Sequence, residues 1–393
     1  MTSRENFRTL LAALLASSLV CAPARALVTL NDGHDRIHVS GSLTVSHDSN
    51  IFAANGGEGD VVYNSSVGAS YARRAGWIGV NASAGMSFGN FTRLKSQNFS
   101  DPSFNLELTK QTGRTTGAFT VSAARESRAD AAANTRSSSW NYVYGLNFRY
   151  NIAGTYDLAG NFGYNEREYV DQANFANLAT YSAAFDLFHV FTTERDLILG
   201  YRYRYSETSF DSTSTDHGIN VGVSGKVFRG VSGSLRGGYQ TRIPRGPTSN
   251  GGSFQSWTAS ASLSYAINKK ANLNATLSKD FSITATDSSV DVLAATLDAQ
   301  YAFNSRLSLT GSVGWGDSQF LGESGRLVID SGPPVVLGPE RHDNYLTFSA
   351  TAGYSFNEHL KIAMTYVWFK NTSNVEFADF IRSSWSLNLS SSW

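Results

Sequence analysis

The sequence predicts an all-β fold: a single antiparallel, up-and-down transmembrane β-barrel of about 18 strands that follows a cleaved signal peptide. Three observations predict it. Apolar and polar residues alternate with a period of two almost everywhere from Arg36 to Trp393. After the N-terminal segment, no apolar run reaches the length of about 20 residues that a membrane helix needs. Aromatic residues gather at both ends of the alternating segments, as they do at the two interfaces of a membrane barrel.

The N-terminus has the features of a secretory signal peptide. Two arginines precede an apolar stretch that ends near Ala22, and an A-x-A cleavage signal ends at Ala26. We therefore expect a signal peptide at 1–26 and one barrel domain at 27–393. Cys21 is the only cysteine, so we expect neither a disulfide framework nor a thiolate metal site in the mature chain.

The composition excludes several function classes. The chain has 32 basic and 32 acidic residues, so no global field points to nucleic acid. Charged residues make up 16% of the chain, below the roughly 25% of ordinary soluble domains. Low charge, 12% aromatic residues and the lack of a predicted membrane helix leave the β-barrel as the membrane class that fits.

Eighteen segments alternate over roughly the 9–12 residues that a tilted membrane-spanning strand needs. We predict strands at 36–47, 61–72, 77–89, 102–111, 117–126, 139–150, 155–167, 178–191, 197–207, 216–227, 231–242, 254–266, 271–281, 290–303, 307–317, 343–356, 360–370 and 381–393.

The connections between these segments alternate between short turns and long polar loops. Short turns lie in the periplasm in bacterial outer-membrane barrels, and an even strand count then places both ends of the barrel there. The longest connection, 317–342, contains "SGPPVVLGP". We expect it either to fold into the mouth of the barrel or to lie against its rim.

The two faces of each segment differ. In "SWTASASLSYA", Trp257 and Tyr265 mark the ends of an apolar face, and hydroxyl residues occupy the other. The C-terminal "SSWSLNLSSSW" alternates in the same way from Trp385 to Trp393. We interpret the apolar face as the lipid-facing side and the polar face as the side that lines the lumen.

The segment "VSHDSNIFAANG", with Asp48, Asn50 and Phe52 after the first strand, resembles the start of the putative β-barrel porin 2 family, as does the tail "YVWFKNTSNVEFADFIRSSWSLNLSSSW". The resemblance covers nearly the whole mature chain. It implies an outer-membrane barrel that acts as a porin or, as for some relatives, accompanies exopolysaccharide export. It carries over no catalytic residue.

No enzyme is predicted. The sequence lacks the motifs G-x-S-x-G, H-E-x-x-H and G-x-x-x-x-G-K-[ST], and its seven histidines have no metal-ligand spacing. We predict no catalytic residue, cofactor or metal. His47 with Asp48, and His217 with Asp216, are interpreted as solvated residues near the outer rim.

The predicted lumen carries charges that are candidates for lining a pore. They are Glu107, Arg149, Asp157, Asp186, Arg202, Arg204, Lys226, Arg236, Arg242 and Asp298. The basic members gather on the ninth to eleventh strands, where they would favour anionic solutes. The alternative is that the arginines pair with carboxylates such as Asp186 and brace the wall.

These patterns favour an outer-membrane porin of a Gram-negative bacterium, a water-filled pore for passive diffusion of small hydrophilic or anionic solutes. An exopolysaccharide export channel with a periplasmic partner protein is one alternative. A non-conducting structural or adhesive barrel is the other. Membrane lipids are expected partners and nucleic acid is not. Both a monomer and a trimer are compatible with the sequence.

Overall fold

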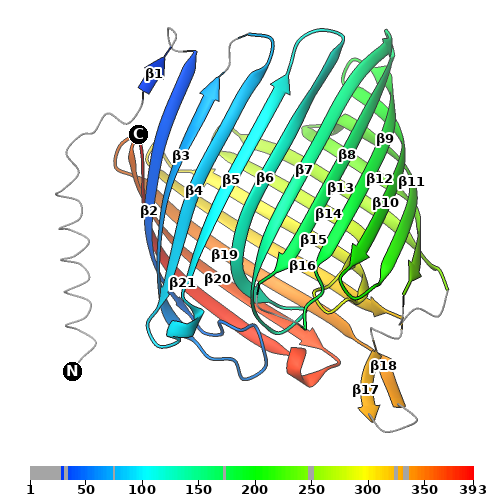
Figure 1. Ribbon diagram of the computed structural model, residues 1–393. Coiled ribbons are helices and arrows are strands. Elements are labelled where there is room, and N and C mark those ends of the chain that lie inside the picture. Colours follow the sequence, from blue (N-terminus) through cyan, green and yellow to red (C-terminus); the bar gives the residue numbers. More distant parts are fainter. Residues whose placement is uncertain are drawn as a thin grey trace.

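The computed structural model describes residues 28–30, 34–73, 76–170, 174–246, 252–322, 326–330 and 336–393. They form a closed antiparallel barrel of 18 strands (Figure 1). The barrel strands are β2 (Asp35–Asp48), β3 (Asp60–Arg73), β4 (Gly79–Phe91), β5 (Phe99–Lys110), β6 (Thr115–Asp130), β7 (Thr135–Ala153), β8 (Tyr156–Tyr169), β9 (Leu178–Thr192), β10 (Arg195–Thr208), β11 (Thr213–Phe228), β12 (Val231–Arg245), β13 (Phe254–Asn268), β14 (Ala271–Ile283), β15 (Ser289–Ala302), β16 (Leu307–Leu321), β19 (His342–Ser355), β20 (Leu360–Ser373) and β21 (Phe380–Ser392).

Each barrel strand pairs with the next one along the chain, and β21 pairs with β2 to close the cylinder. All 18 predicted strands are present, which confirms the predicted fold class. A short β1 (Val28–Leu30) adds to the start of β2. Two 3₁₀ helices, η2 (Lys95–Gln97) and η4 (Glu376–Ala378), lie in loops. Among the described residues, no helix is long and apolar enough to span a membrane.

The longest connection holds a separate two-stranded ribbon. β17 (Arg326–Asp330) pairs with β18 (Val336–Glu340), and neither strand joins the barrel sheet. In Figure 1 this ribbon extends away from the barrel, beyond the strand ends that carry the long loops. The described strands of this connection therefore do not fold into the mouth.

One face of each strand exposes large apolar side chains. On β11, Ile219 and Val221 are 59% and 61% exposed, whereas Asn220 between them is partly buried. A band of exposed apolar residues on this scale needs an apolar environment, and in a barrel that environment is the lipid. The predicted alternation therefore corresponds to side chains that face the lipid and the lumen in turn.

The residues of the "DSN" segment close the barrel. The Arg382 guanidinium donates to both carboxylate oxygens of Asp48, at 2.6–3.1 Å. The Ser49 backbone N–H donates to the Ser383 carbonyl at 2.9 Å, and the Asn50 side chain donates to the Ile381 carbonyl at 3.4 Å. These contacts join the first and last barrel strands, which are the only neighbours in the described barrel that lie far apart in the sequence.

The C-terminal tryptophan belongs to the same seam. The Trp393 backbone exchanges two hydrogen bonds of 2.9 Å with Val39 of β2. Its indole ring stacks on the His359 imidazole, with ring centroids 4.1 Å apart and planes inclined by 6°. The terminal residue is thus tied into the barrel at the end with the short turns.

Candidate functional site in the barrel lumen

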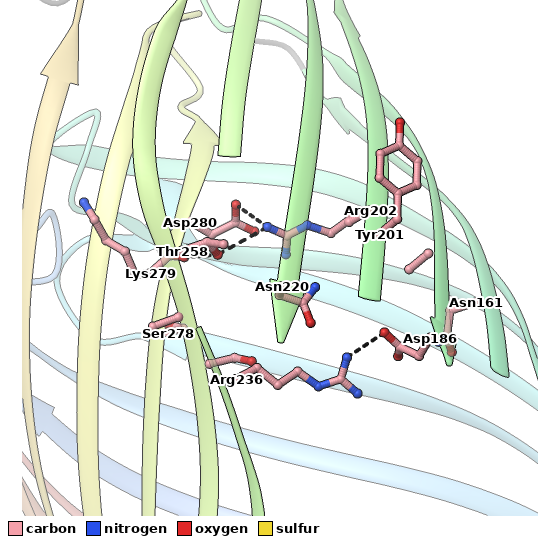
Figure 2. A pocket seen from close by; sticks show the side chains of 13 residues that line it. Asn161, Asp186, Tyr201, Arg202, Asn220, Arg236, Thr258, Ser278, Lys279 and Asp280 are labelled. Atoms are coloured by element: carbon pink, nitrogen blue, oxygen red, sulfur yellow. Dashed lines mark hydrogen bonds and ion pairs between the residues drawn. The ribbon is translucent and has the colours of Figure 1, made fainter. Parts of the chain in front are cut away.

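Charged side chains from β9, β10, β12 and β14 meet in the interior (Figure 2). Arg236 donates to Asp186 at 2.8 Å. Arg202 lies 3.2 Å from Asp280, which belongs to a strand four positions further along the barrel wall. Figure 2 shows the two pairs on either side of Asn220. The side chains border a cavity of about 310 Å³.

A third carboxylate completes the cluster. Asp216 lies 2.6 Å from Arg204 and 2.7 Å from Arg242. The Arg242 side chain is only 1% exposed, and its guanidinium also donates to the Ser282 carbonyl at 2.7 Å. A buried guanidinium requires both a counter-ion and acceptors for its remaining protons, and this arrangement supplies them.

The arginines predicted as a basic patch are therefore paired. Arg202, Arg204, Arg236 and Arg242 face Asp186, Asp216 and Asp280, which leaves a formal charge of one positive unit in the cluster. The pairing of Arg236 with Asp186 is the alternative that the sequence left open. Most of these charges are neutralised by their partners in the barrel wall, and only one net positive charge remains to attract solutes.

A second charged group lies nearer the short turns. Arg149 lies 2.6 Å from Asp157 and 3.2 Å from Asp196, and its guanidinium is 4.5 Å from the centre of the Phe188 ring. This group has a formal charge of one negative unit. Lys226 pairs with Glu194 at the adjacent turn.

The two remaining candidates stand apart from both clusters. Glu107 accepts a hydrogen bond from Asn81 at 3.2 Å. Asp298 lies opposite Asn274 and Ser312 in register, and the described residues offer it no ion pair. The structure therefore brings together most of the predicted charges and leaves these two isolated.

The outer end of β14 leaves the barrel wall. Its pairing with β13 stops at Lys279, whereas its pairing with β15 continues to Ile283. Beyond this point the β14 backbone lies against side chains of β10 and β12, because the Phe281 and Ser282 carbonyls accept from Arg204 and Arg242. The charged cluster thus holds the outer part of the β14–β15 hairpin inside the barrel.

The β6–β7 hairpin also leaves its neighbours. The β5–β6 ladder ends at Ser103, next to Pro102, which has no N–H to donate. Beyond this point Asp101 connects β5 to β6 through its side chain. Its carboxylate accepts hydrogen bonds from the backbone N–H and the hydroxyl of Ser127, both at 2.9 Å. At the hairpin tip the Ala132 carbonyl accepts from Arg341 at 2.8 Å. Since Arg341 precedes β19 on the far side of the barrel, this hairpin crosses the mouth.

These crossings were missed in the sequence, although part of the signal was present. Asp216 was interpreted as a solvated residue near the rim, and this was wrong, because it is buried between Arg204 and Arg242. Asp216 and Asp280 both lie on the inward face of their strands, so the parity rule could have found them. Arg341 lies outside the strands, so no pattern of alternation applies to it. Pro102 could have indicated from the sequence that the β5–β6 ladder ends there.

Residues 208–392 match the sequence profile of a family described as Putative beta-barrel porin 2. Over these residues, the chain is similar to the Putative beta-barrel porin 2 family. The match covers the barrel from the end of β10 through β21. The protein is a porin-like barrel of the outer membrane of Gram-negative bacteria. No curated protein sequence matches the chain.

Solved outer-membrane barrels are similar in fold. OpdK of Pseudomonas aeruginosa, solved with vanillate, is 12% identical over 91% of this chain and 99% of its own, with a TM-score of 0.46. OccK2 (OpdF) of the same organism, solved with glucuronate, is 12% identical over 91% and 97%, with a TM-score of 0.48. The siderophore receptor PirA of Acinetobacter baumannii is 8% identical over 91% and 80%, with a TM-score of 0.46.

On the other side of the barrel, hydroxyl and amide groups line the middle of the interior, and charged side chains such as Asp48, Arg382 and Asp343 lie toward the outer strand ends. The hydroxyl and amide groups bond to one another across neighbouring strands: Ser42 with Ser66 at 2.8 Å, Thr351 with Thr365 at 2.9 Å, and Asn388 with Thr44 at 2.7 Å. The described residues contain no group of three or more His, Cys, Asp or Glu side chains able to hold a metal ion. The middle of this side can form hydrogen bonds to water and to polar solutes without a fixed charge.

Proposed function

We propose that the protein is a passive outer-membrane pore for small hydrophilic solutes. The observation that carries the proposal is the hydroxyl and amide lining in the middle of one side of an 18-strand barrel. Barrels of 16–18 strands are wide enough to enclose an aqueous channel, and a hydroxyl lining keeps such a channel wet. The proposal includes no chemical reaction, and it holds for a monomer and for a trimer alike.

In this proposal the charged residues line the path. The residues concerned are Arg149, Asp157, Asp186, Arg202, Arg204, Lys226, Arg236, Arg242 and Asp298. The main cluster, which lies beside the inward β14–β15 hairpin, retains one positive unit, and the Arg149 group nearer the short turns carries one negative unit. We expect the cluster at the hairpin to dominate and to give weak anion preference, not strict selection. Solutes pass between this cluster and the opposite hydroxyl lining.

The inward hairpins favour small solutes over polymers. The β6–β7 hairpin reaches Arg341 across the mouth, and the β14–β15 hairpin joins the β8–β9 loop, where the Ala176 N–H donates to the Ala285 carbonyl at 2.8 Å. Both contacts reduce the opening through which a chain of sugars would have to leave. We therefore rank the diffusion pore above an exopolysaccharide export channel.

The test is single-channel conductance of the refolded barrel in a planar bilayer, with the reversal potential under a KCl gradient. Steady openings with slight anion preference are expected. Swelling of proteoliposomes in sugars of increasing size gives the size limit, and monosaccharides should enter much faster than tetrasaccharides. Electrical silence of the well-folded barrel would refute the pore. It would favour instead a structural barrel or a channel that needs a periplasmic partner.

A further inference from the structure

A second cavity, of about 450 Å³, lies at the outer end of the barrel between the two inward hairpins. The tip of the β6–β7 hairpin forms one side. Strands β14, β15, β16, β19 and β20 form the other. The cavity lies where a solute from outside first meets the narrowed mouth.

The strand side of this cavity carries an apolar patch beside polar residues such as Ser282, Ser318 and Asn371. Ile283, Val290, Val292 and Phe320 contribute aliphatic and aromatic surface. Val290 and Phe320 are buried, with 2% and 4% of their surface exposed. These residues occur at the outer ends of strands whose deeper lumen positions carry serine and threonine.

Two aromatic rings provide a flat surface within this apolar patch. The rings of Tyr345 and Phe369 are stacked with centroids 5.6 Å apart and planes inclined by 20°. Phe369 stacks in turn on Phe380, at 5.5 Å and 26°. The Tyr345 ring lies over Gly316, where the absence of a Cβ leaves room for the ring to lie against β16. We call Tyr345 and Phe369 the aromatic platform.

The hairpin side supplies guanidinium groups. The Arg128 side chain is 60% exposed, and its carboxylate partner, Glu126, is 3.5 Å away. Since a guanidinium has five N–H donors, Arg128 retains donors for a ligand. Arg167 also borders the cavity; it donates to Asn141 at 2.9 Å and lies 3.9 Å from the same Glu126, so the two guanidinium groups share one carboxylate.

The carboxylates of the cavity are already engaged. Asp343 accepts from Arg341 at 2.6 Å and from Ser373 at 2.6 Å. Asp130 accepts from the backbone N–H groups of Ala132 and Ala133. A sugar needs free acceptors as well as donors around its hydroxyl groups, so this cavity suits it poorly. An apolar ring with one anionic group matches the apolar patch on the strand side of the cavity and the guanidinium groups opposite it.

We propose that this cavity is a binding subsite for small amphipathic anions, in which an apolar or aromatic ring carries one carboxylate. The ring lies on the aromatic platform, and the carboxylate points to Arg128 and Arg167. The inference deepens the proposed pore function and rests on it, because it names a solute class that the pore would collect at its mouth.

Ligand binding tests the subsite independently of conduction. The full barrel in nanodiscs is titrated with benzoate, benzamide, acetate and glucose, and binding is followed by saturation-transfer difference NMR. We expect benzoate to bind about tenfold more tightly than acetate, since burial of a ring adds on the order of 1–2 kcal/mol. Benzamide, which keeps the ring without the charge, should bind more weakly than benzoate.

Three variants locate the site. Phe369→Ser should weaken benzoate and benzamide alike, by about tenfold. Arg128→Gln should weaken benzoate and leave benzamide unchanged. Thr365→Ser, which lies deeper on the same strand and keeps its hydroxyl, is the matched control and should change neither. Heat-modifiable migration on SDS gels verifies that each variant is folded.

Each outcome has a defined meaning. Equal affinity of wild type and Phe369→Ser for benzoate, or acetate or glucose binding as tightly as benzoate, would overturn the subsite. A conducting barrel without benzoate binding would keep the pore and reject the subsite. Benzoate binding by an electrically silent barrel would keep the subsite as a ligand site and reject the pore. Reduction of current by benzoate added to the outer side, lost in Phe369→Ser, would support both.

Discussion

The two sides of the barrel interior differ in what their polar groups do. We call the inward side chains of β7–β14 the charged wall and those of β16, β19–β21 and β2–β3 the hydroxyl wall. In the charged wall, guanidinium and carboxylate groups are paired over several strands, as in Arg202 with Asp280. In the hydroxyl wall, contacts such as Thr351 with Thr365 join adjacent strands only. The charged wall therefore organises the inward hairpin, and the hydroxyl wall leaves the path open.

The difference has an energetic basis. Removing one member of a buried ion pair leaves the other charge uncompensated in a low-dielectric environment. Exchanging a hydroxyl pair for apolar groups of similar shape is nearly neutral. The same type of substitution should thus have unequal effects on the two walls, and the following variants test that asymmetry in order of decreasing effect.

The largest effect is expected for Asp216→Asn. It removes the carboxylate shared by Arg204 and Arg242, of which Arg242 is almost fully buried. We expect a loss of stability of about 3 kcal/mol, measured as a lower temperature for loss of the folded band on SDS gels. Asp298→Asn is the control, since the described residues give Asp298 no ion pair. Equal melting of the two variants would contradict a structural role for the cluster.

Asp280→Ala should release the β14–β15 hairpin. It removes an acceptor shared by Arg202 and Arg204, so the outer part of β14 keeps only the contacts of its Phe281 and Ser282 carbonyls with the interior. We expect larger and noisier single-channel currents than in wild type. Asn274→Ala, on the same face of β14 nearer the short turn, is the matched control. Unchanged conductance in Asp280→Ala would show that the hairpin does not limit flow.

Arg236→Gln and Asp186→Asn neutralise in turn the two members of the Arg236–Asp186 ion pair. The first lowers the net charge of the cluster by one unit, and the second raises it by one. The reversal potential in a KCl gradient should move toward cation preference in Arg236→Gln and toward anion preference in Asp186→Asn. Shifts of the same sign would argue against these residues as part of the conducting path.

The smallest effect is expected in the hydroxyl wall. Replacing both Thr351 and Thr365 by valine removes one hydroxyl pair with 2.9 Å between the oxygens. The change in stability should stay below about 1 kcal/mol, because both partners of the hydrogen bond are removed together. Melting on SDS gels provides the comparison with Asp216→Asn. A loss as large as that of Asp216→Asn would remove the distinction between the walls.

The sequence predicted the barrel closely because its strands obey one rule, alternation with period two. All 18 strands appear near their predicted positions, and the parity that placed Arg236 in the lumen also placed its partner, Asp186. The rule assumes a regular wall, however. It could not foresee that β14 would leave β13 after Lys279, because that departure is set by tertiary contacts to Arg204 and Arg242.

The connection at 317–342 shows that composition alone did not predict which segment narrows the mouth. Its apolar and proline-rich composition made it a natural choice for a segment that narrows the mouth. The narrowing instead comes from the β6–β7 and β14–β15 hairpins, which continue as ordinary strands beyond their neighbours. Composition identifies a long loop, but the point at which a ladder ends depends on single residues such as Pro102.

The closing seam has a consequence for how the barrel forms. Every other ladder joins strands that follow one another in the chain, so each can form as a local hairpin at small entropic cost. The Asp48–Arg382 pair spans 334 residues, and the closure entropy of the whole cylinder falls on this one ladder. The seam is therefore the last pairing to form. Its bidentate ion pair, placed at the outer end, adds a contact that only the closed cylinder can make.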